Sequence, residues 1–515
     1  MKATKLLLLL LVITSCASKP SRLDTALQLA GENRPELEKV LSHYHSDPND
    51  SLKYQAACFL IENMPYHYYY EGKLLDQFST VYEALKRVKD ASVVLDSLTL
   101  RFGNFSLNSI QLKHDVTSLQ SSYLIENIDL AFRVWEGQPW CKHIPFDQFC
   151  RFILPYRVNN EQPDSTRRVL YEKYNPLLDS LRQTGNADDP LMAAQVLIST
   201  LSKEEKFFTA QASRIPLASP LLMDKYRAGS CRDMADLTVS IFRAVGIPSG
   251  IEFIPIHGCL NTSHCWTFIL DKKGDTYTSD YLADKILPTT ETLHQTAKIF
   301  RELFEVNQSL ESEIQKETKA TPRFYRNPRF EDVTPLYSEK QPLTVTLSED
   351  AWYDKKVPNV VYLCVSKFQE WEPISWTTTK NKQATFGGIK AEYSPTDTMN
   401  HGFSKQVFSI LPKPMQTYFE NVVFRVAEWK GESLNPLTDP FVVHQNGDIE
   451  FFTPQEEKEQ ITVFSKFGPF TDGFVQHLPE VYLREATTEP SIKRHTSLDQ
   501  HCSHPIKERS SDQQE

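Results

Sequence analysis

The sequence predicts an α+β protein of several domains: a helical N-terminal region, a mixed core of helix and strands, and β-sandwich-like modules toward the C-terminus. The chain has 515 residues, more than one hydrophobic core normally serves. Apolar residues recur at helical spacing over residues 22–184, whereas short strand-like runs between turn residues dominate after residue 335. The 40% hydrophobic and 24% charged content is typical of folded chains.

The first 16 residues have the pattern of a lipoprotein signal peptide. Two lysines precede the apolar run of residues 6–13, which is too short to span a bilayer. Small residues then lead to Cys16, and the whole resembles a bacterial lipobox, which implies lipidation of Cys16. An ordinary cleaved signal with an incidental cysteine is the alternative.

The rest of the chain divides by composition. We expect residues 22–184 to form the helical region, residues 185–300 the mixed core, and the polar, Lys- and Glu-rich residues 301–334 a linker. Strand-like runs such as "VVYLCV" and "NVVFRVAEW" predict β-rich modules over residues 335–486. The polar residues 487–515 should be disordered.

One predicted helix carries a cysteine in its first turn. In "AGSCRDMADLTVSIFRAVGIPSG" a small-residue turn precedes Cys231, an apolar stripe follows, and Gly246 ends the helix. Unpaired backbone N–H groups and the positive end of the helix dipole favour thiolate over thiol there. The thiolate of a nucleophilic cysteine is stabilised most at this position. A buried structural cysteine would fit the same pattern.

A predicted β-hairpin supplies two further groups. "SHCWTFILDKKGDTYTSDYL" alternates apolar side chains from His264 onward, turns at residues 272–274, and resumes as a second strand. If the loop has those three residues, with Gly274 in the left-handed region, Asp280 lies diagonal to His264 on one face. A two-residue loop would put them on opposite faces.

These motifs resemble the transglutaminase-like superfamily, which shares its Cys-His-Asp arrangement with papain-like thiol enzymes. The match comprises G-x-C-x-D ending at Asp233, "GIP" at residues 246–248, H-x-W from His264, and the late Asp280, over roughly residues 185–290. The segments "PWCKHIPFDQFCRFILPYRVNNE", "WEPISW" and "DPFVVHQNGDIEFF" also resemble large lipoproteins of Bacteroides-type bacteria that carry this core.

The resemblance implies a cysteine peptidase, amidase or acyltransferase without a cofactor or metal. Cys231 would attack an amide carbonyl, His264 would carry the proton to the leaving amine, and Asp280 would orient His264. The backbone N–H of Cys231 would form half of an oxyanion hole.

Further residues complete the site that the resemblance implies. Gln195 and Gln211 are the candidates for the second oxyanion donor and for substrate binding, each with an ordinary polar helix position as its alternative. Trp266 is a further substrate-side candidate that we expect to pack beside the site, and Asp233 should cap or brace the helix start.

Two other classes of function compete with the enzyme. His257, Cys259, His264 and Cys265 could hold a metal, but their spacing matches no usual zinc pattern. A catalytically degenerate domain that binds glycan or protein at the cell envelope is the stronger alternative. The sequence also leaves open whether Cys141 pairs with Cys150, or Cys259 with Cys265, in a disulfide.

The expected partners follow from charge and anchor. A net charge of −10 leaves no basic excess for nucleic acid. We expect a peptide or protein amide substrate, a possible glycan on the C-terminal module, and membrane contact through the lipid. No acidic run follows Cys16, which favours a periplasm-facing anchor, most readily in the outer membrane, over surface export.

Overall fold

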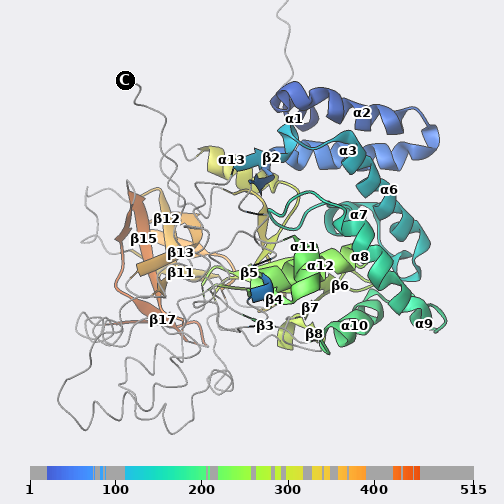
Figure 1. Ribbon diagram of the computed structural model, residues 1–515. Helices are drawn as coiled ribbons and strands as arrows, with labels where there is room; N and C mark the ends of the chain where they lie inside the picture. The colour runs from blue at the N-terminus through green and yellow to red at the C-terminus, as the bar shows by residue number, and fades with distance from the viewer. Residues whose placement is uncertain are drawn as a thin grey trace, which may run out of the picture.

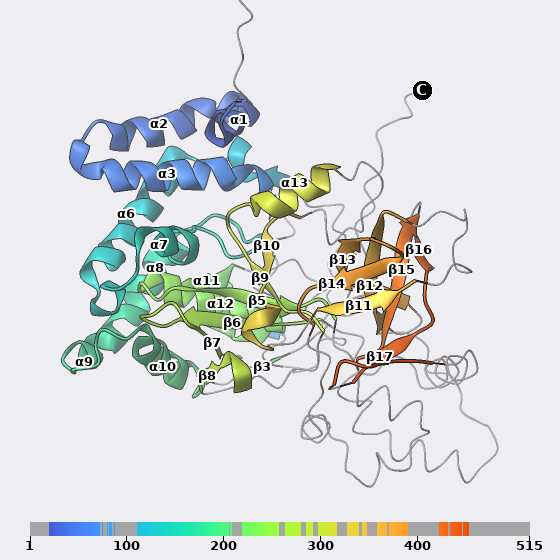
Figure 2. The ribbon, with the colours of Figure 1, turned by 180° about the vertical axis from the view of Figure 1, so that it is seen from behind.

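Figures 1 and 2 show the computed structural model, with the N-terminal helices stacked at one end and the C-terminal strands gathered at one side. It describes residues 20–72, 75, 80, 82–84, 87, 111–204, 207–208, 219–256, 263–279, 285–291, 297–316, 327–338, 342–347, 358–367, 370–389, 422–430, 433–444 and 446–452. Cys16 and the expected tail at residues 487–515 lie outside these ranges. Among the described residues, no helix has the length and apolar content needed to cross a bilayer.

The region expected to be helical is built mainly of helices. They are α1 (Arg22–Leu29), α2 (Arg34–His45), α3 (Ser51–Asn63), α6 (Ser121–Gly137), α7 (Phe146–Phe152), α8 (Thr166–Tyr174) and α9 (Asp179–Arg182). A short antiparallel ribbon of β1 (Tyr68–Glu71) and β2 (Gln111–His114) interrupts them. Their buried side chains form one cluster that also takes in Leu237 and Ile241 of α12 (Cys231–Ala244), so these helices share a core with the central part of the chain.

The central part is one six-stranded antiparallel sheet with helices packed against it. Its order is β10-β9-β5-β6-β7-β8. The strands are β5 (Ser249–Ile254), β6 (His264–Leu270), β7 (Thr276–Ser279), β8 (Leu287–Pro288), β9 (Phe300–Glu302) and β10 (Phe330–Asp332). The helices are α10 (Pro190–Leu201), α11 (Pro220–Tyr226) and α12 (Cys231–Ala244), and a short parallel pair joins β3 (Phe207–Phe208) to β4 (Ala228–Gly229). Helix α12 lies along β5 and β6 (Figure 2).

The range 301–334 differs from the expected linker. It contains α13 (Gln308–Lys316), the end of β9 and the whole of β10, and the last two strands belong to the central sheet. Strand β9 pairs with β5 through Glu252 opposite Arg301, and β10 pairs with β9. Strands of three residues leave too little sequence for a period of two to be visible, and their pairing joins residues far apart in the chain.

The C-terminal part is β-rich, as expected. Its strands are β11 (Leu343–Thr346), β12 (Val360–Lys367), β13 (Glu370–Thr378), β14 (Gln383–Phe386), β15 (Phe424–Lys430), β16 (Ser433–Pro436), β17 (Phe441–Val443) and β18 (Ile449–Phe451). The pair β11-β14 and the larger sheet β13-β12-β15-β17-β18 share one hydrophobic cluster. In β11, Leu343 and Val345 are buried while Thr344 and Thr346 are exposed, which is the alternation of a strand with one face in a core. The chain is therefore an α+β protein with several sheets.

Candidate active site

Helix α12 begins at Cys231 because the residues around it cap the helix. The Asp233 carboxylate accepts a hydrogen bond from the Ser230 N–H at 2.9 Å, and the Ser230 Oγ accepts one from the Asp233 N–H at 3.4 Å. This capping box satisfies N–H groups that a helix start leaves without intrahelical partners. Asp233 thus braces the helix start, as expected, and fixes the first turn in which Cys231 lies.

The hairpin that carries His264 has the register of a three-residue loop. Thr267 lies opposite Ser279, the Asp271 N–H donates to the Asp275 carbonyl at 2.9 Å, and Gly274 has φ of +87°. The conditional prediction of this loop is therefore confirmed, and the two-residue alternative is wrong. Asp280 lies outside the described residues, so its position relative to His264 stays a prediction.

The sulfur of Cys231 lies beside both His264 and Cys265. A hydrogen bond with the Cys265 thiol is the largest influence that lowers the Cys231 pKa, and a hydrogen bond and the charge of His264 act in the same direction against the effect of burial. The pKa of Cys265 is raised, because its thiol donates to the Cys231 sulfur and is itself buried. The arrangement favours a Cys231 thiolate that accepts a hydrogen bond from a neutral Cys265.

Cys265 is the functional neighbour that the sequence analysis missed. It packs with Ala235 and Val239 of α12, so it lies on the helix side of β6. Alternation along a strand places Cys265 on the side opposite to Trp266, and this signal was present in the sequence. Because Cys231 starts α12 and His264 starts β6, the sulfur contacts the imidazole at the strand end as well as the neighbouring thiol.

Trp266 is buried in structural contacts on the other side of the sheet. Its side chain is 1% exposed, and its Nε1–H donates to the Tyr337 hydroxyl at 3.1 Å. The ring centroids of His264 and Trp266 are 6.0 Å apart. Trp266 therefore packs beside the site, and its burial argues against the substrate-binding role considered for it.

Of the two candidates for the second oxyanion donor, Gln195 and Gln211, the structure describes only Gln195. Gln195 lies on α10, where its Nε2 donates to the Ser199 Oγ at 3.1 Å, one turn further along the same helix. That contact is typical of an ordinary polar helix residue. Gln211 lies outside the described residues.

Cys141 and Cys150 do not form the disulfide that the sequence left open. Both side chains are free thiols, and Cys141 donates to the Gly246 carbonyl at 2.9 Å. Cys265 is also a free thiol, while its suggested partner Cys259 lies outside the described residues, as does His257 of the rival metal site.

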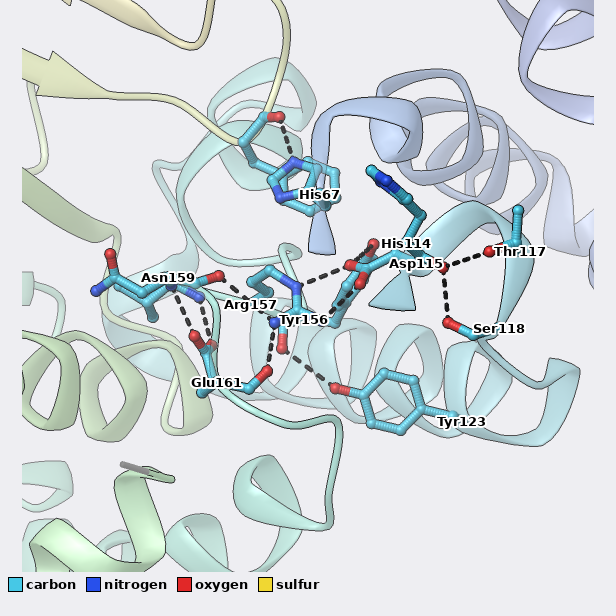
Figure 3. A network of polar contacts seen from close by, with 12 residues as sticks. His67, His114, Asp115, Thr117, Ser118, Tyr123, Tyr156, Arg157, Asn159 and Glu161 are labelled. Carbon is cyan, nitrogen blue, oxygen red and sulfur yellow. Dashed lines mark hydrogen bonds and ion pairs between the residues drawn. The ribbon is translucent and has the colours of Figure 1, made fainter. Parts of the chain in front are cut away.

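A buried polar network holds the loop at residues 157–161 against the helices (Figure 3). The Arg157 guanidinium donates to both carboxylate oxygens of Asp115 at 2.8 Å, and these side chains are 1% and 0% exposed. Tyr156 donates to the same carboxylate at 2.9 Å. A bidentate pair of this kind is rigid, because both fork positions of the arginine are occupied.

The same loop reaches the residue next to Cys231. The Glu161 carboxylate accepts from the Val158 N–H at 2.7 Å and from the Asn159 N–H at 2.8 Å, which fixes the loop backbone (Figure 3). The Asn159 Oδ1 then accepts from the Arg232 Nε at 2.8 Å. The N-terminal region thereby positions the first turn of α12.

Comparisons with known proteins supply no family. No protein-family model matches the chain, and no curated protein matches it. A solved structure described as a "Putative Cysteine Protease" from Cytophaga hutchinsonii is similar over 26% of this chain and 41% of that one, with 18% identity and a TM-score of 0.19. This chain thus spans about two fifths of that protein. A similarity of this extent carries no argument, so the site residues alone must support a function.

Proposed function

We propose that the protein is a thiol enzyme of the transglutaminase-like type, with Cys231 as the nucleophile toward a peptide or amide acyl group. The observation that carries the proposal is the contact of one sulfur with His264 and Cys265 at a capped helix N-terminus. Each influence stabilises the thiolate, which is the nucleophilic form of cysteine.

The mechanism follows from these positions. The Cys231 thiolate attacks the amide carbonyl, and protonated His264 gives its proton to the leaving amine, which departs as the C–N bond breaks. A thioester remains on Cys231. Neutral His264 then takes a proton from water, or from an acceptor amine, as that nucleophile attacks the thioester and releases the thiolate. The Cys231 N–H as oxyanion donor and Asp280 as the group that orients His264 belong to this proposal.

The proposed location is the bacterial cell envelope. Acyl chains on Cys16 would hold the chain on the membrane, with the periplasmic side of the outer membrane as the favoured site. Metabolic labelling with palmitate tests the anchor, because Cys16→Ser should lose the label. A variant that keeps the label would contradict the anchor without affecting the thiol mechanism.

A binding scaffold is the second candidate, and one observation favours it. A groove of about 740 Å³ lies between the central sheet and the β-rich part, with Trp376 among its lining residues together with the polar Asn307, Asp332 and Asn359. An aromatic ring beside amides and a carboxylate is suited to a sugar ring. A glycan partner on the C-terminal part would use this groove whether or not Cys231 is catalytic.

Selective alkylation separates the two candidates. The measurement is peptide mapping after brief exposure of the folded protein to iodoacetamide at about pH 6, where a free thiol with a pKa of about 8.5 is almost wholly protonated. Cys58 is the matched control, because it is partly exposed like Cys231 but its pKa is raised by burial. Cys231 should be alkylated before Cys58. If Cys231 is alkylated no faster than Cys58, the thiol enzyme is contradicted and the binding scaffold is favoured.

A further inference from the structure

A polar cavity adjoins the first turn of α12. Its volume is about 160 Å³, and its lining includes Val158, Asn159, Arg232, Glu302, Asn327 and Arg329. Arg232 directly follows Cys231, and Val158 belongs with Cys231 to one packed cluster. Two lining residues are thus neighbours of Cys231, one in sequence and one in packing. The cavity can hold a small polar group with several waters, since liquid water occupies about 30 Å³ per molecule.

The charge of Arg232 is matched within the cavity wall. Its guanidinium forms an ion pair with the Glu302 carboxylate and donates to the Asn159 side chain. Both partners are fixed, Asn159 by the loop described above and Glu302 by strand β9. Arg232 and Glu302 together thus add no net charge to the cavity.

Arg329 has no ion pair among the residues that the structure describes. Across the part of the chain that the structure describes, no carboxylate lies within ion-pair distance of its guanidinium, and its Nε is buried without a hydrogen-bond acceptor. Burial lowers the pKa of Arg329, although the charge of Glu302 acts in the opposite direction. A buried guanidinium N–H without an acceptor is costly, because its desolvation is not offset.

The neighbour of Arg329 cannot neutralise it. The Nη1 of Arg329 lies 3.1 Å from the His67 Nδ1, and the His67 Nε2 lies 2.9 Å from the Phe304 carbonyl oxygen. A carbonyl oxygen only accepts, so the proton of His67 is on Nε2 and its Nδ1 accepts from Arg329. Burial and the charge of Arg329 lower the pKa of His67, which keeps the ring neutral. The cavity lining thus has two guanidinium groups, Arg232 and Arg329, and one carboxylate, Glu302.

We infer that this cavity binds a carboxylate of the acyl donor, with Arg329 as the cation that receives it. The guanidinium fork matches the planar carboxylate, and a bound carboxylate would balance the second guanidinium of the cavity lining. The inference rests on the proposed function, because it makes the cavity a specificity site beside Cys231. It predicts that substrates carry an acidic group near the bond that is cleaved or transferred.

Direct binding tests the site without any enzymatic assay. Succinate and its neutral isostere succinamide are titrated separately into the full-length wild-type protein by isothermal calorimetry. Succinate should bind at least about tenfold more tightly, because only it offers a charged acceptor. Equal binding of the two probes would overturn the inference, as would tighter binding of inorganic phosphate than of succinate.

A variant pair locates the binding. Arg329→Gln should abolish the preference for succinate, whereas Arg168→Gln, at an exposed arginine paired with Glu126, should keep it. If Arg329→Gln does not fold, Arg329→Lys retains the charge without the fork and should bind more weakly than the wild type. Retention of full affinity in the folded Arg329 variant would contradict the assignment.

Protection of the thiol links the cavity to the acyl donor. Succinate should slow iodoacetamide labelling of Cys231 in the wild type. It should slow this labelling by the same factor in the Arg168→Gln variant. Succinate binding without protection of Cys231 would overturn the link. Failure of the proposed function has a different signature, since Cys231 would then label no faster than Cys58 even when no succinate is added.

Discussion

Removing the Cys265 thiol should raise the pKa of Cys231. The hydrogen bond from Cys265 is the largest influence that lowers this pKa, and in Cys265→Ala it is lost while the backbone and His264 stay in place. The Cys231 thiolate then lacks its strongest hydrogen-bond donor. We expect alkylation of Cys231 to become slower at acidic pH and the pH profile of labelling to move to higher pH.

The size of the effect follows from the energy of the bond. A hydrogen bond to a charged group contributes about 1.5–3 kcal/mol. Since about 1.4 kcal/mol corresponds to a factor of ten in an equilibrium, the thiolate population on the acid limb should fall by roughly 10- to 100-fold. The alkylation rate at those pH values should fall by the same factor, because only the thiolate reacts.

The assay is the rate of iodoacetamide labelling of Cys231 between about pH 4 and pH 8.5, which spans the range below the free thiol pKa. Cys265→Ser keeps a donor and should restore most of the wild-type rate. Cys364→Ala also removes a buried thiol, but from strand β12, and controls for the general effect of a core cavity. The reasoning is refuted if the alanine and serine variants at position 265 both follow the wild-type profile.

Three further predictions concern stability, measured by urea unfolding. Asp115→Asn should lower the free energy of unfolding by about 3–5 kcal/mol because it leaves the buried Arg157 guanidinium without its carboxylate partner. Glu126→Gln in an exposed pair should change it by less than about 1 kcal/mol, and equal losses would contradict this. Ser230→Ala should lower it by about 1 kcal/mol through loss of the helix cap, and no loss would show that the capping box does not stabilise α12. His67 has a lowered pKa in the folded protein, so below about pH 6.5 the unfolded chain takes up a proton that the folded chain refuses. Stability should therefore fall from that pH toward the lowered pKa, by at most about 1.4 kcal/mol per pH unit, and a His67→Gln variant with the wild-type slope would contradict it.

Local features of the site could be predicted from the sequence because neighbouring residues determine them. The cap of α12 joins Ser230 to Asp233, three residues apart, and the hairpin register depends on a loop that ends at Gly274. Which residues of β6 share a face likewise required only a period of two, although all of Cys265–Leu270 are buried. Such features depend on backbone geometry within a few residues, so their sequence signals are strong.

The tertiary structure alone decided which distant groups meet. The sulfur of Cys231 lies beside Cys265 only because α12 packs along β6, and Arg232 meets Asn159 across 73 positions of sequence. Strands β9 and β10 became part of the central sheet instead of a linker through pairing with distant strands. Arg329 and His67 are separated by 262 positions, so their contact had no local signal. The sequence by itself determined the helix cap, the hairpin register and the reactive residue types. Packing determined the electrostatic environment, because Coulomb and hydrogen-bond energies depend on distances that only the folded chain has.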